Sequence, residues 1–378
     1  MKAYVLHLFS VAGGGERVSL EIARLLKDKG FKIVYLANSS DALKKVANLL
    51  GLPGDYEVIE VDSLLEELLA HTGRFVRLRR LLLMERGLSI LSSIKEEDAL
   101  IVDTSTNYPL NVDVSYIHYP LTLPTIKSNS FYFKLYDRVV RAAARRSKGY
   151  PKIVLTNSTW TASILKKVFN LNASVIHPPV DVDYFSFDWR KKERAIVTIS
   201  RLTPEKNLHL LPEVASKLGD YEWYLVGSLG TVKSELDVSM RIFRKIKQEV
   251  DKHGVKNFHV LLNLPRKELR ELLLNSMFYV HPVFPEHFGI SVAEAISAGC
   301  IPVVYKNGGS WTDIVMPISP GLGYETINDI VRIIRSLEEN PSNMNRLMTR
   351  AVEHSRKFRA EVFRKRFIEE LAKYGVID

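Results

Sequence analysis

Residues 3–37 read AYVLHLFSVAGGGERVSLEIARLLKDKGFKIVYLA, and this stretch decides the fold class. An apolar, β-rich run over Ala3–Phe9 is followed by glycines, by a helical pattern over Glu16–Lys29, and by a second β-rich run over Lys32–Ala37. Strands that alternate with helices are typical of a parallel sheet covered by helices on both faces. The stretch therefore predicts an α/β protein.

The alternation continues along the chain in two series. The first series has further strands expected at Tyr56–Val61, Ala99–Val102, Val114–Ile117 and Ile153–Thr156. The second has strands expected at Arg194–Ser200, Glu222–Val226, Phe258–Leu262, Met277–His281 and Ile301–Tyr305, and helices at Asn207–Lys217, Val238–His253 and Lys267–Asn275. Two series of this kind predict two Rossmann-like, doubly wound domains.

The length of 378 residues also favours two domains, because single cores rarely grow beyond about 250–300 residues. We expect an N-terminal Rossmann-like domain over residues 1–180 and a C-terminal Rossmann-like domain over residues 181–355, joined through Ile176–Trp189. A C-terminal helix over residues 356–378 is expected to return to the N-terminal domain. The two domains should face each other across a cleft, because such sheets bind ligands beyond the carboxyl ends of their strands.

The composition narrows the class of protein. Hydrophobic residues make up 46% and charged residues 25% of the chain, which is typical of a globular protein, and no apolar run of about 18 residues predicts a membrane span. Cys300 is the only cysteine, so no intrachain disulfide is possible and a reducing compartment fits. The net charge of +10 predicts an anionic partner: nucleotide phosphates, nucleic acid or an acidic membrane surface.

Gly13-Gly14-Gly15-Glu16 follows the first expected strand and opens a helix. Glycines let the backbone approach a ligand closely, and the free N–H groups at a helix start favour a phosphate. The run does not match the dinucleotide-binding G-x-G-x-x-G pattern. A tight turn is an equally good interpretation of these residues alone.

Arg201-Leu-Thr-Pro-Glu-Lys206 lies where the first strand of the second domain gives way to a helix, which Pro204 can start. Arg201 and Lys206, a fork-shaped and a compact cation, suit a diphosphate. We expect Lys206 to be exposed in the cleft. A solvated charged turn is the alternative interpretation.

Glu286-His-Phe-Gly-Ile-Ser-Val-Ala-Glu294 is the most specific motif in the chain. Gly289 marks a close turn into a helix, so Glu286 should lie in the loop and Glu294 in the first turns of the helix. Two carboxylates at this separation can bind different sugar hydroxyls, one on a ribose and one on a transferred hexose. The alternative is that Glu294 is an acid favoured by the helix dipole. The small residues that follow, Ala295-Ile-Ser-Ala-Gly299, argue for a closely packed helix.

Two further polar positions need an interpretation. His118 closes the strand of Tyr116-Ile-His-Tyr-Pro120, so it should face the cleft, although a lone histidine is more often structural. Asp181-Val-Asp183 looks like a metal-binding pair, but its place in a domain link favours a turn, and we expect no metal.

Together these motifs resemble glycosyltransferase family 4, whose fold is called GT-B. The resemblance runs through nearly the whole chain. Within the family, the sequence looks most like the eukaryotic dolichol-pathway α-1,2-mannosyltransferases. Its landmarks are GGGERVSLEIA (13–23), YIHYPLTLPT (116–125), LTNSTWTASIL (155–165), VIHPPVDVDYF (175–185), RLTPEKN (201–207), EHFGISVAEAISAG (286–299) and NGGSWTDIV (307–315).

The resemblance implies that residues 1–180 form the acceptor-side domain and residues 181–355 the nucleotide-sugar-binding domain. It also implies a role for each matching residue. Gly14 and Gly15 would bring backbone to the donor, and His118 would lie at the reacting sugar. Arg201 and Lys206 would neutralise the diphosphate, and Glu286 would bind donor sugar hydroxyls. Glu294 would bind the ribose. The remaining donor-binding positions that the resemblance implies are Asn263 and Leu264 beside the base, and the backbone N–H groups of Phe288, Gly289 and Ile290.

The implied activity is a retaining, metal-independent transfer of a hexose, best matched by mannose from GDP-mannose, to a lipid-linked glycan. No cofactor besides the nucleotide sugar is expected. A transferase that makes a storage glucan or small glycoside from UDP- or ADP-glucose is one alternative, and a basic nucleic-acid-binding protein is another.

We expect the enzyme on the cytoplasmic face of an acidic membrane, bound peripherally. Two basic stretches with interleaved apolar residues, 73–84 and 131–148, are typical of interfacial helices. Two ordinary surface helices are the alternative interpretation. The segment after Gly227–Gly230 departs from the family pattern.

Overall fold

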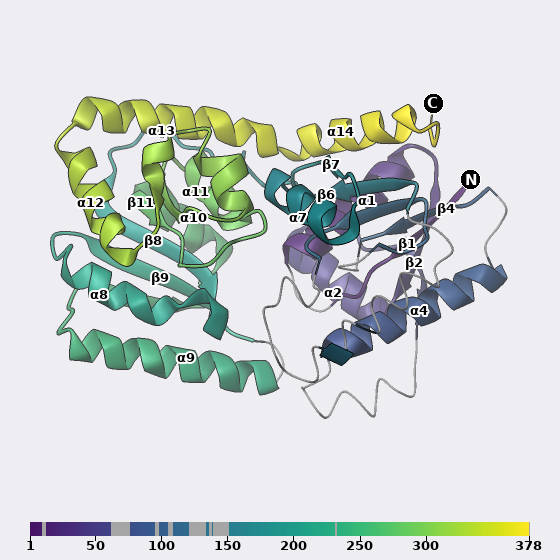
Figure 1. Cartoon of the computed structure of the whole chain (residues 1–378), viewed down its shortest axis with the longest axis horizontal. Helices are drawn as coiled ribbons and strands as arrows, with labels where there is room; N and C mark the ends of the chain where they lie inside the picture. Colours follow the sequence, from purple (N-terminus) through teal and green to yellow (C-terminus); the bar gives the residue numbers. More distant parts are fainter. Residues whose placement is uncertain are drawn as a thin grey trace. The chain divides into compact units, whose positions relative to one another are not determined.

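The computed structural model describes residues 1–9, 13–61, 76–94, 98–104, 109–120, 134–135, 138, 151–230 and 233–377, without the side chains of 76–84 and 233–235. The chain divides into two compact units (Figure 1). The first unit contains residues 1–179 and 360–378, and the second contains residues 180–359.

The first unit alternates strands and helices and ends with the last helix of the chain. Its elements are β1 (Lys2–Leu6), α1 (Gly14–Asp28), β2 (Lys32–Ala37), α2 (Ser40–Leu50), β3 (Glu57–Glu60), α4 (Val76–Ile94), β4 (Leu100–Asp103), β5 (Val114–Ile117), β6 (Ile153–Thr156), α7 (Thr159–Phe169), β7 (Ser174–Val175) and α14 (Ala360–Lys373). The strands pair in the order β3-β2-β1-β4-β5-β6-β7, and every pairing is parallel.

The apolar pattern of β1 explains why this sheet needs helices on both faces. Ala3 and Val5 point into a core that contains residues of α1 and α14, whereas Tyr4 and Leu6 point into a second core that contains Leu91 of α4. Successive strand residues alternate between faces, so a strand that is apolar throughout must be buried on both sides.

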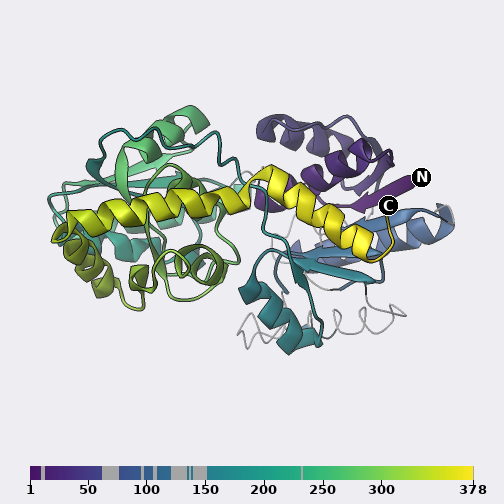
Figure 2. The same cartoon turned by 90° about the horizontal axis from the view of Figure 1, so that it is seen from above.

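Helix α14 completes the first unit although it is the last helix in sequence. Phe363, Phe367 and Leu371 are buried in the same core as α1, and Arg364 forms an ion pair with the buried Glu21 at 3.1 Å. Figure 2, which looks down on this helix, shows it crossing over the strands of the first unit.

The second unit repeats the pattern with a second parallel sheet. Its elements are β8 (Glu193–Arg201), η1 (Pro204–Lys206), η2 (Leu208–Leu210), α8 (Leu211–Ser216), β9 (Glu222–Ser228), α9 (Lys233–Lys252), β10 (Phe258–Leu262), α10 (Arg266–Asn275), β11 (Ser276–Val280), α11 (Ile290–Ser297), β12 (Ile301–Tyr305), η3 (Ser310–Val315), η4 (Pro320–Leu322), β13 (Gly323–Tyr324), α12 (Ile327–Glu338), α13 (Pro341–Ser355) and η5 (Arg356–Phe358).

The strand order of the second sheet is β10-β9-β8-β11-β12-β13. Strands β9 and β10 therefore extend the sheet on one side of β8, whereas β11, β12 and β13 extend it on the other side. Such a reversal opens a crevice at the carboxyl ends of the two central strands, which is where ligands bind in open α/β sheets. A ligand-binding site is therefore expected in the loops after β8 and β11.

The helix predicted over Asn207–Lys217 is wrong in its first half. Two 3₁₀ turns, η1 and η2, precede a short helix, α8. Asn207 adopts φ +51°, which ends η1, and Pro212 supplies no N–H for a longer helix. Among the described helices, none combines the length and the apolar character that a membrane span requires.

Candidate functional site

The predicted donor-binding residues of the second unit gather along the carboxyl edge of its sheet. Arg201 is the last residue of β8, Lys206 ends η1, Asn263 follows β10, and Glu286 lies in the loop after β11. The strand order therefore brings together motifs that are about 80 residues apart in the chain.

Lys206 and Glu286 form an ion pair at the centre of this edge. The Lys206 ammonium also lies 3.9 Å from the centroid of the Phe284 ring. Lys206 is only 6% exposed, so the expectation of a cleft-exposed lysine is wrong. The reason is that Phe284 and Glu286, from the loop after β11, cover its ammonium and pair its charge.

The His281 ring is a second neighbour of the same carboxylate. Its Nε2 lies 3.5 Å from Oε2 of Glu286, and the His281 side chain is buried. Burial alone would raise the pKa of Glu286, but the Lys206 ammonium and the His281 ring hold that pKa well below the ordinary value. Glu286 is therefore an ionised hydrogen-bond acceptor at neutral pH and not a proton donor.

His287, the next residue along the motif, is neutral at neutral pH. Burial lowers the pKa of His287 to about 4, and the charges of Lys206 and Arg201 act in the same direction against the opposing charge of Glu286. The charge of Arg201, which is exposed at the end of β8, therefore reaches the motif.

The backbone around Glu286 is fixed by two glycines. Gly309 N donates to Glu286 O at 2.7 Å, and a Cβ on Gly308 would stand 2.4 Å from the same oxygen. Gly289 adopts φ +102° at the start of α11, a conformation that side chains disfavour. The close turn predicted at Gly289 is confirmed, and the loop that carries Glu286 tolerates no side chain at Gly308.

Helix α11 places Glu294 near Glu286. Burial raises the pKa of the Tyr279 hydroxyl, and the charges of Glu286 and Glu294 both add to this rise, so the two carboxylates act on one hydroxyl. Phe288 is buried against Phe358 at 5.2 Å between ring centroids, so its ring is a core residue, and Ile290 is half-buried.

Asn263 braces the loop that follows β9. It adopts φ +50°, its N–H donates to Gly227 O at 2.9 Å, and its Oδ1 accepts from Leu229 N at 3.0 Å. Leu264 packs on the core of the unit. The structure therefore gives Asn263 a role in shaping the loop 227–230, and its predicted contact with a base stays a prediction.

The first unit carries its own predicted residues at the carboxyl edge of its sheet. Gly14 and Gly15 open α1 after β1, and His118 follows β5. A Cβ on Gly15 would stand 3.4 Å from Nε2 of His118, so the glycine run and the histidine are neighbours. Asn157 Nδ2 donates to His118 O at 2.8 Å and holds the end of this strand in place.

Asp181 and Asp183 each form an ion pair with an arginine of the second unit. Asp181 contacts Arg266, and Asp183 contacts Arg359 at 2.7 Å. Across the described ranges, no cluster of three or more His, Cys, Asp or Glu side chains has the arrangement of metal ligands.

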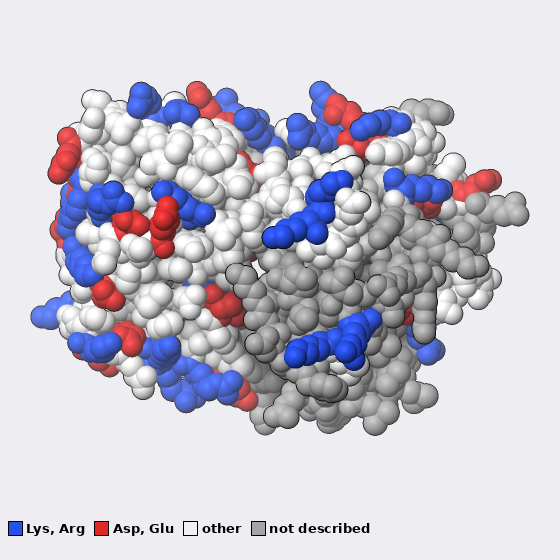
Figure 3. All heavy atoms as spheres, in the orientation of Figure 1, with Lys and Arg blue, Asp and Glu red and all other residues white. Residues whose placement is uncertain are grey.

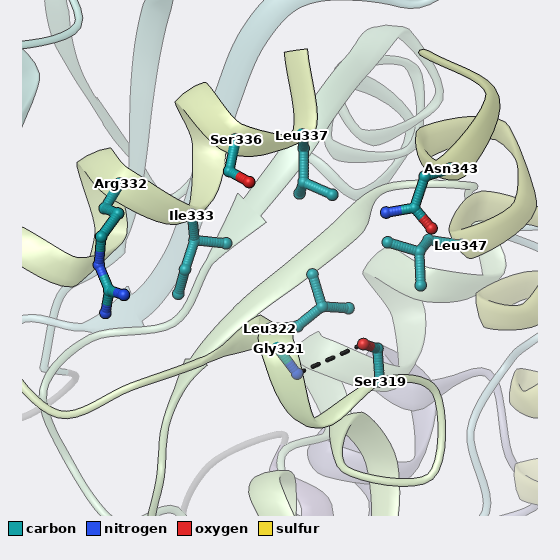
Figure 4. A pocket seen from close by; sticks show the side chains of 9 residues that line it. All are labelled: Ser319, Gly321, Leu322, Arg332, Ile333, Ser336, Leu337, Asn343 and Leu347. Carbon is teal, nitrogen blue, oxygen red and sulfur yellow. Dashed lines mark hydrogen bonds between the residues drawn. The ribbon is translucent and has the colours of Figure 1, made fainter. Parts of the chain in front are cut away.

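One pocket of about 250 Å³ lies away from these residues, between η4, α12 and α13 (Figure 4). Its wall includes Arg332, which is already paired with Asp329 at 2.7 Å, and the hydroxyl of Ser319, which accepts from Gly321 N at 3.3 Å. None of the predicted site residues lines it, so we assign the site to the sheet edge and not to this pocket.

Two residues of the site, His281 and Phe284, were not predicted from the sequence. His281 was expected only as the last residue of the strand Met277–His281, and no prediction was made for Phe284. Their only signal is their position directly after β11, since loops at that edge carry the site in this fold.

The fold and the motif of the second unit are similar to those of glycosyltransferases. Residues 181–356 match the family model described as "Glycosyl transferases group 1", so the second unit is a domain of that family. This confirms the resemblance seen in the sequence.

Curated relatives give a narrower comparison. Proteins named GDP-Man:Man(3)GlcNAc(2)-PP-Dol alpha-1,2-mannosyltransferase are 25% identical over 70% of this chain in Dictyostelium discoideum and 25% identical over 82% in Mus musculus. In Caenorhabditis elegans the identity is 23% over 96% of this chain. The matched regions span 54%, 73% and 89% of these relatives, so the chain corresponds to only about half of the first one.

Solved structures support the fold. WaaG, a glycosyltransferase involved in lipopolysaccharide biosynthesis, superposes with a TM-score of 0.71 at 14% identity, covering 99% of this chain and 100% of that one. HepE of Anabaena, solved with UDP, has a TM-score of 0.71 at 18% identity and the same coverage. The predicted class, two parallel-sheet α/β domains of the GT-B type, is confirmed.

Proposed function

We propose that this protein transfers a hexose, best matched by mannose from GDP-mannose, to a lipid-linked glycan with retention of anomeric configuration. The ion pair of Lys206 and Glu286 at the crevice between β8 and β11 is the observation that carries this proposal. A cation suited to a diphosphate and a carboxylate suited to sugar hydroxyls lie side by side in a domain that matches the glycosyl transferases group 1 model, which supports the proposal. The names of the curated relatives supply the sugar and the acceptor.

The charges of the site suit the leaving group. Negative charge builds on the diphosphate as the glycosidic bond breaks, and fixed cations at Arg201 and Lys206 would stabilise it in place of a metal ion. Arg201 is exposed and available to a ligand, and Lys206 reaches the same edge.

The acceptor hydroxyl would attack on the face that the diphosphate leaves, and its proton would pass to a phosphate oxygen of the leaving group. The new glycosidic bond forms as the sugar–phosphate bond breaks, so no enzyme nucleophile is needed. Glu286 binds a sugar hydroxyl as an acceptor, a role that its lowered pKa supports. Both of its contacts use Oε2, and Oε1 makes no hydrogen bond with the side chains that the structure describes.

Because the proposed acceptor is linked to a lipid, we also propose that the protein contacts the cytoplasmic face of a membrane. The stretches 73–84 and 131–148 that predict it lie outside the described residues, apart from the backbone of 76–84 and residues 134, 135 and 138. A second basic surface is described: Lys and Arg side chains gather along α9 (Figure 3). Its exposed members are Arg241, Arg244, Lys245, Lys247 and Lys252.

Donor turnover across GDP- and UDP-sugars, with and without a lipid-linked acceptor, tests the proposal, and a thermal-shift screen of nucleotides narrows the donor first. GDP-mannose turnover that needs the lipid acceptor is the expected result. Turnover of UDP- or ADP-glucose without a lipid would favour the storage-glucan or glycoside alternative. Tight, salt-sensitive RNA binding without any sugar-nucleotide turnover would favour the nucleic-acid-binding alternative.

A further inference from the structure

We propose that Tyr119 and Trp160 form an aromatic platform on which a pyranose ring of the glycan acceptor stacks. The inference rests on the proposed function, because it assumes that the acceptor is a glycan. It deepens that function by assigning acceptor-binding residues to the first unit, where the residues predicted from the sequence are Gly14, Gly15 and His118.

The two rings come from neighbouring segments at one edge of the first sheet. Strands β5 and β6 pair in parallel, with Ile117 opposite Thr156, so the residues that follow these strands emerge side by side. Tyr119 lies in the loop after β5, and Trp160 lies in the first turn of α7, which follows β6. Tyr119 is also next to His118 in the chain. A ligand of this pair would therefore lie beside the residue predicted to meet the reacting sugar.

The rings of Tyr119 and Trp160 are stacked almost parallel. Their centroids are 5.5 Å apart, and their planes differ by 7°. Both residues are half-buried, so part of the pair is reachable from solvent. The face of an aromatic ring is negative, and the C–H groups of a pyranose, which carry a small positive charge, pack against it. Tyrosine and tryptophan also offer a large contact area with only two side-chain torsions to restrict, so the pair suits a sugar ring.

The main chain around the pair is held in place by hydrogen bonds within the first unit. Asn157 Nδ2 donates to His118 O at 2.8 Å, which ties the residue before Tyr119 to the loop that leads into α7. The hydroxyl of Ser158 caps the start of α7 and so fixes the turn that carries Trp160. A platform that is rigid before binding loses little conformational entropy when the ligand arrives, which favours affinity.

Two changes at Trp160 separate stacking from packing. Trp160→Phe keeps an aromatic face, whereas Trp160→Leu removes it and leaves an apolar side chain. We expect Trp160→Leu to raise the acceptor KM about 10-fold or more, and Trp160→Phe to stay within about threefold of wild type. The donor KM should not change in either variant. Trp189→Leu, which alters an exposed tryptophan of the second unit, is the matched control and should leave both KM values unchanged.

Two kinetic results would overturn the inference. One is an equal rise of the acceptor and donor KM in Trp160→Leu, because a packing defect or a contact with the donor would then explain the effect. The other is an acceptor KM that stays at the wild-type value in Trp160→Leu, because the ring would then contribute nothing to acceptor binding.

A binding measurement separates this inference from the proposed function, which a wild-type protein without nucleotide-sugar turnover would contradict. Intrinsic tryptophan fluorescence is titrated with free mannotriose and, in parallel, with GDP. We expect mannotriose to cause a saturable change in wild type and in Trp189→Phe, and no change in Trp160→Phe. The inference fails if wild type shows no change, if Trp160→Phe shows the same change, or if only GDP produces a change that depends on Trp160.

Discussion

Gly15 and His118 lie so close that a single methyl group on the glycine would touch the imidazole ring, 3.4 Å from its Nε2. The two residues come from different elements, Gly15 from the first turn of α1 and His118 from the loop after β5, at the same edge of the first sheet. The glycine run therefore keeps space open beside the histidine.

Gly15→Ala should fold normally and transfer poorly. The contact of 3.4 Å is tolerable, and alanine is favoured over glycine in a helix, so the melting temperature should not fall. The methyl group would occupy space predicted to take the donor, and turnover should fall by about 10- to 100-fold. Gly219→Ala, where a Cβ meets nothing within 4 Å, is the matched control and should leave turnover unchanged. Wild-type turnover in Gly15→Ala would remove Gly15 from the site.

Lys206→Ala should lower turnover by on the order of 10²-fold or more, as the loss of a transition-state charge partner does. Because Lys206 is buried, we also expect lower stability, which Lys217→Ala at an exposed ion pair should not show. Glu286→Gln should leave nucleotide affinity unchanged and strongly lower the rate of sugar transfer. Steady-state kinetics with calorimetric nucleotide titrations checks all three variants, and normal turnover in Lys206→Ala would refute the diphosphate assignment.

Transfer should not depend on a divalent ion. Arg201 and Lys206 supply the positive charge that a metal ion would otherwise bring to the diphosphate. Full activity is therefore expected in excess EDTA. Loss of activity that Mn²⁺ or Mg²⁺ restores would contradict the proposed mechanism.

Acid should destabilise the protein through His287. The pKa of His287 is lowered to about 4 in the folded chain, below its unfolded value near 6.5, so the unfolded chain binds the proton more readily between these values. Stability is then lost as the pH falls from about 6.5 to 4. His287→Gln should reduce this loss by on the order of 3 kcal/mol. Denaturant unfolding across this range measures it, and parallel curves for the two proteins would disprove it.

Anionic vesicles should bind the protein through the first unit. Arg141, Arg145 and Arg146 changed together to Glu should abolish co-sedimentation, since each basic residue near an anionic surface contributes roughly 1 kcal/mol. Arg241, Arg244 and Lys245 of α9 changed to Glu make the same change in charge and serve as the control. If only the control variant loses binding, or if the wild-type protein does not co-sediment with anionic vesicles at low salt, the predicted docking surface is wrong.

The sequence predicts the strands better than the site. Strands such as Val114–Ile117 and Phe258–Leu262 match the prediction, because buried parallel strands are continuous apolar runs bounded by polar residues. The two-residue strands β7 and β13 were missed, since so short a run carries no periodicity. The pairing of Lys206 with Glu286 depends on strand order, which no local pattern records.

Helix α14 also sets the order in which the protein can be completed during synthesis. Residues 1–179 leave the ribosome first, yet the core around Phe363, Phe367 and Leu371 is supplied by residues 360–378. The second unit, which is continuous in sequence, can finish folding while the first still exposes the apolar face that α14 covers. The core of the first unit therefore stays incomplete until the whole second unit and α14 have been translated.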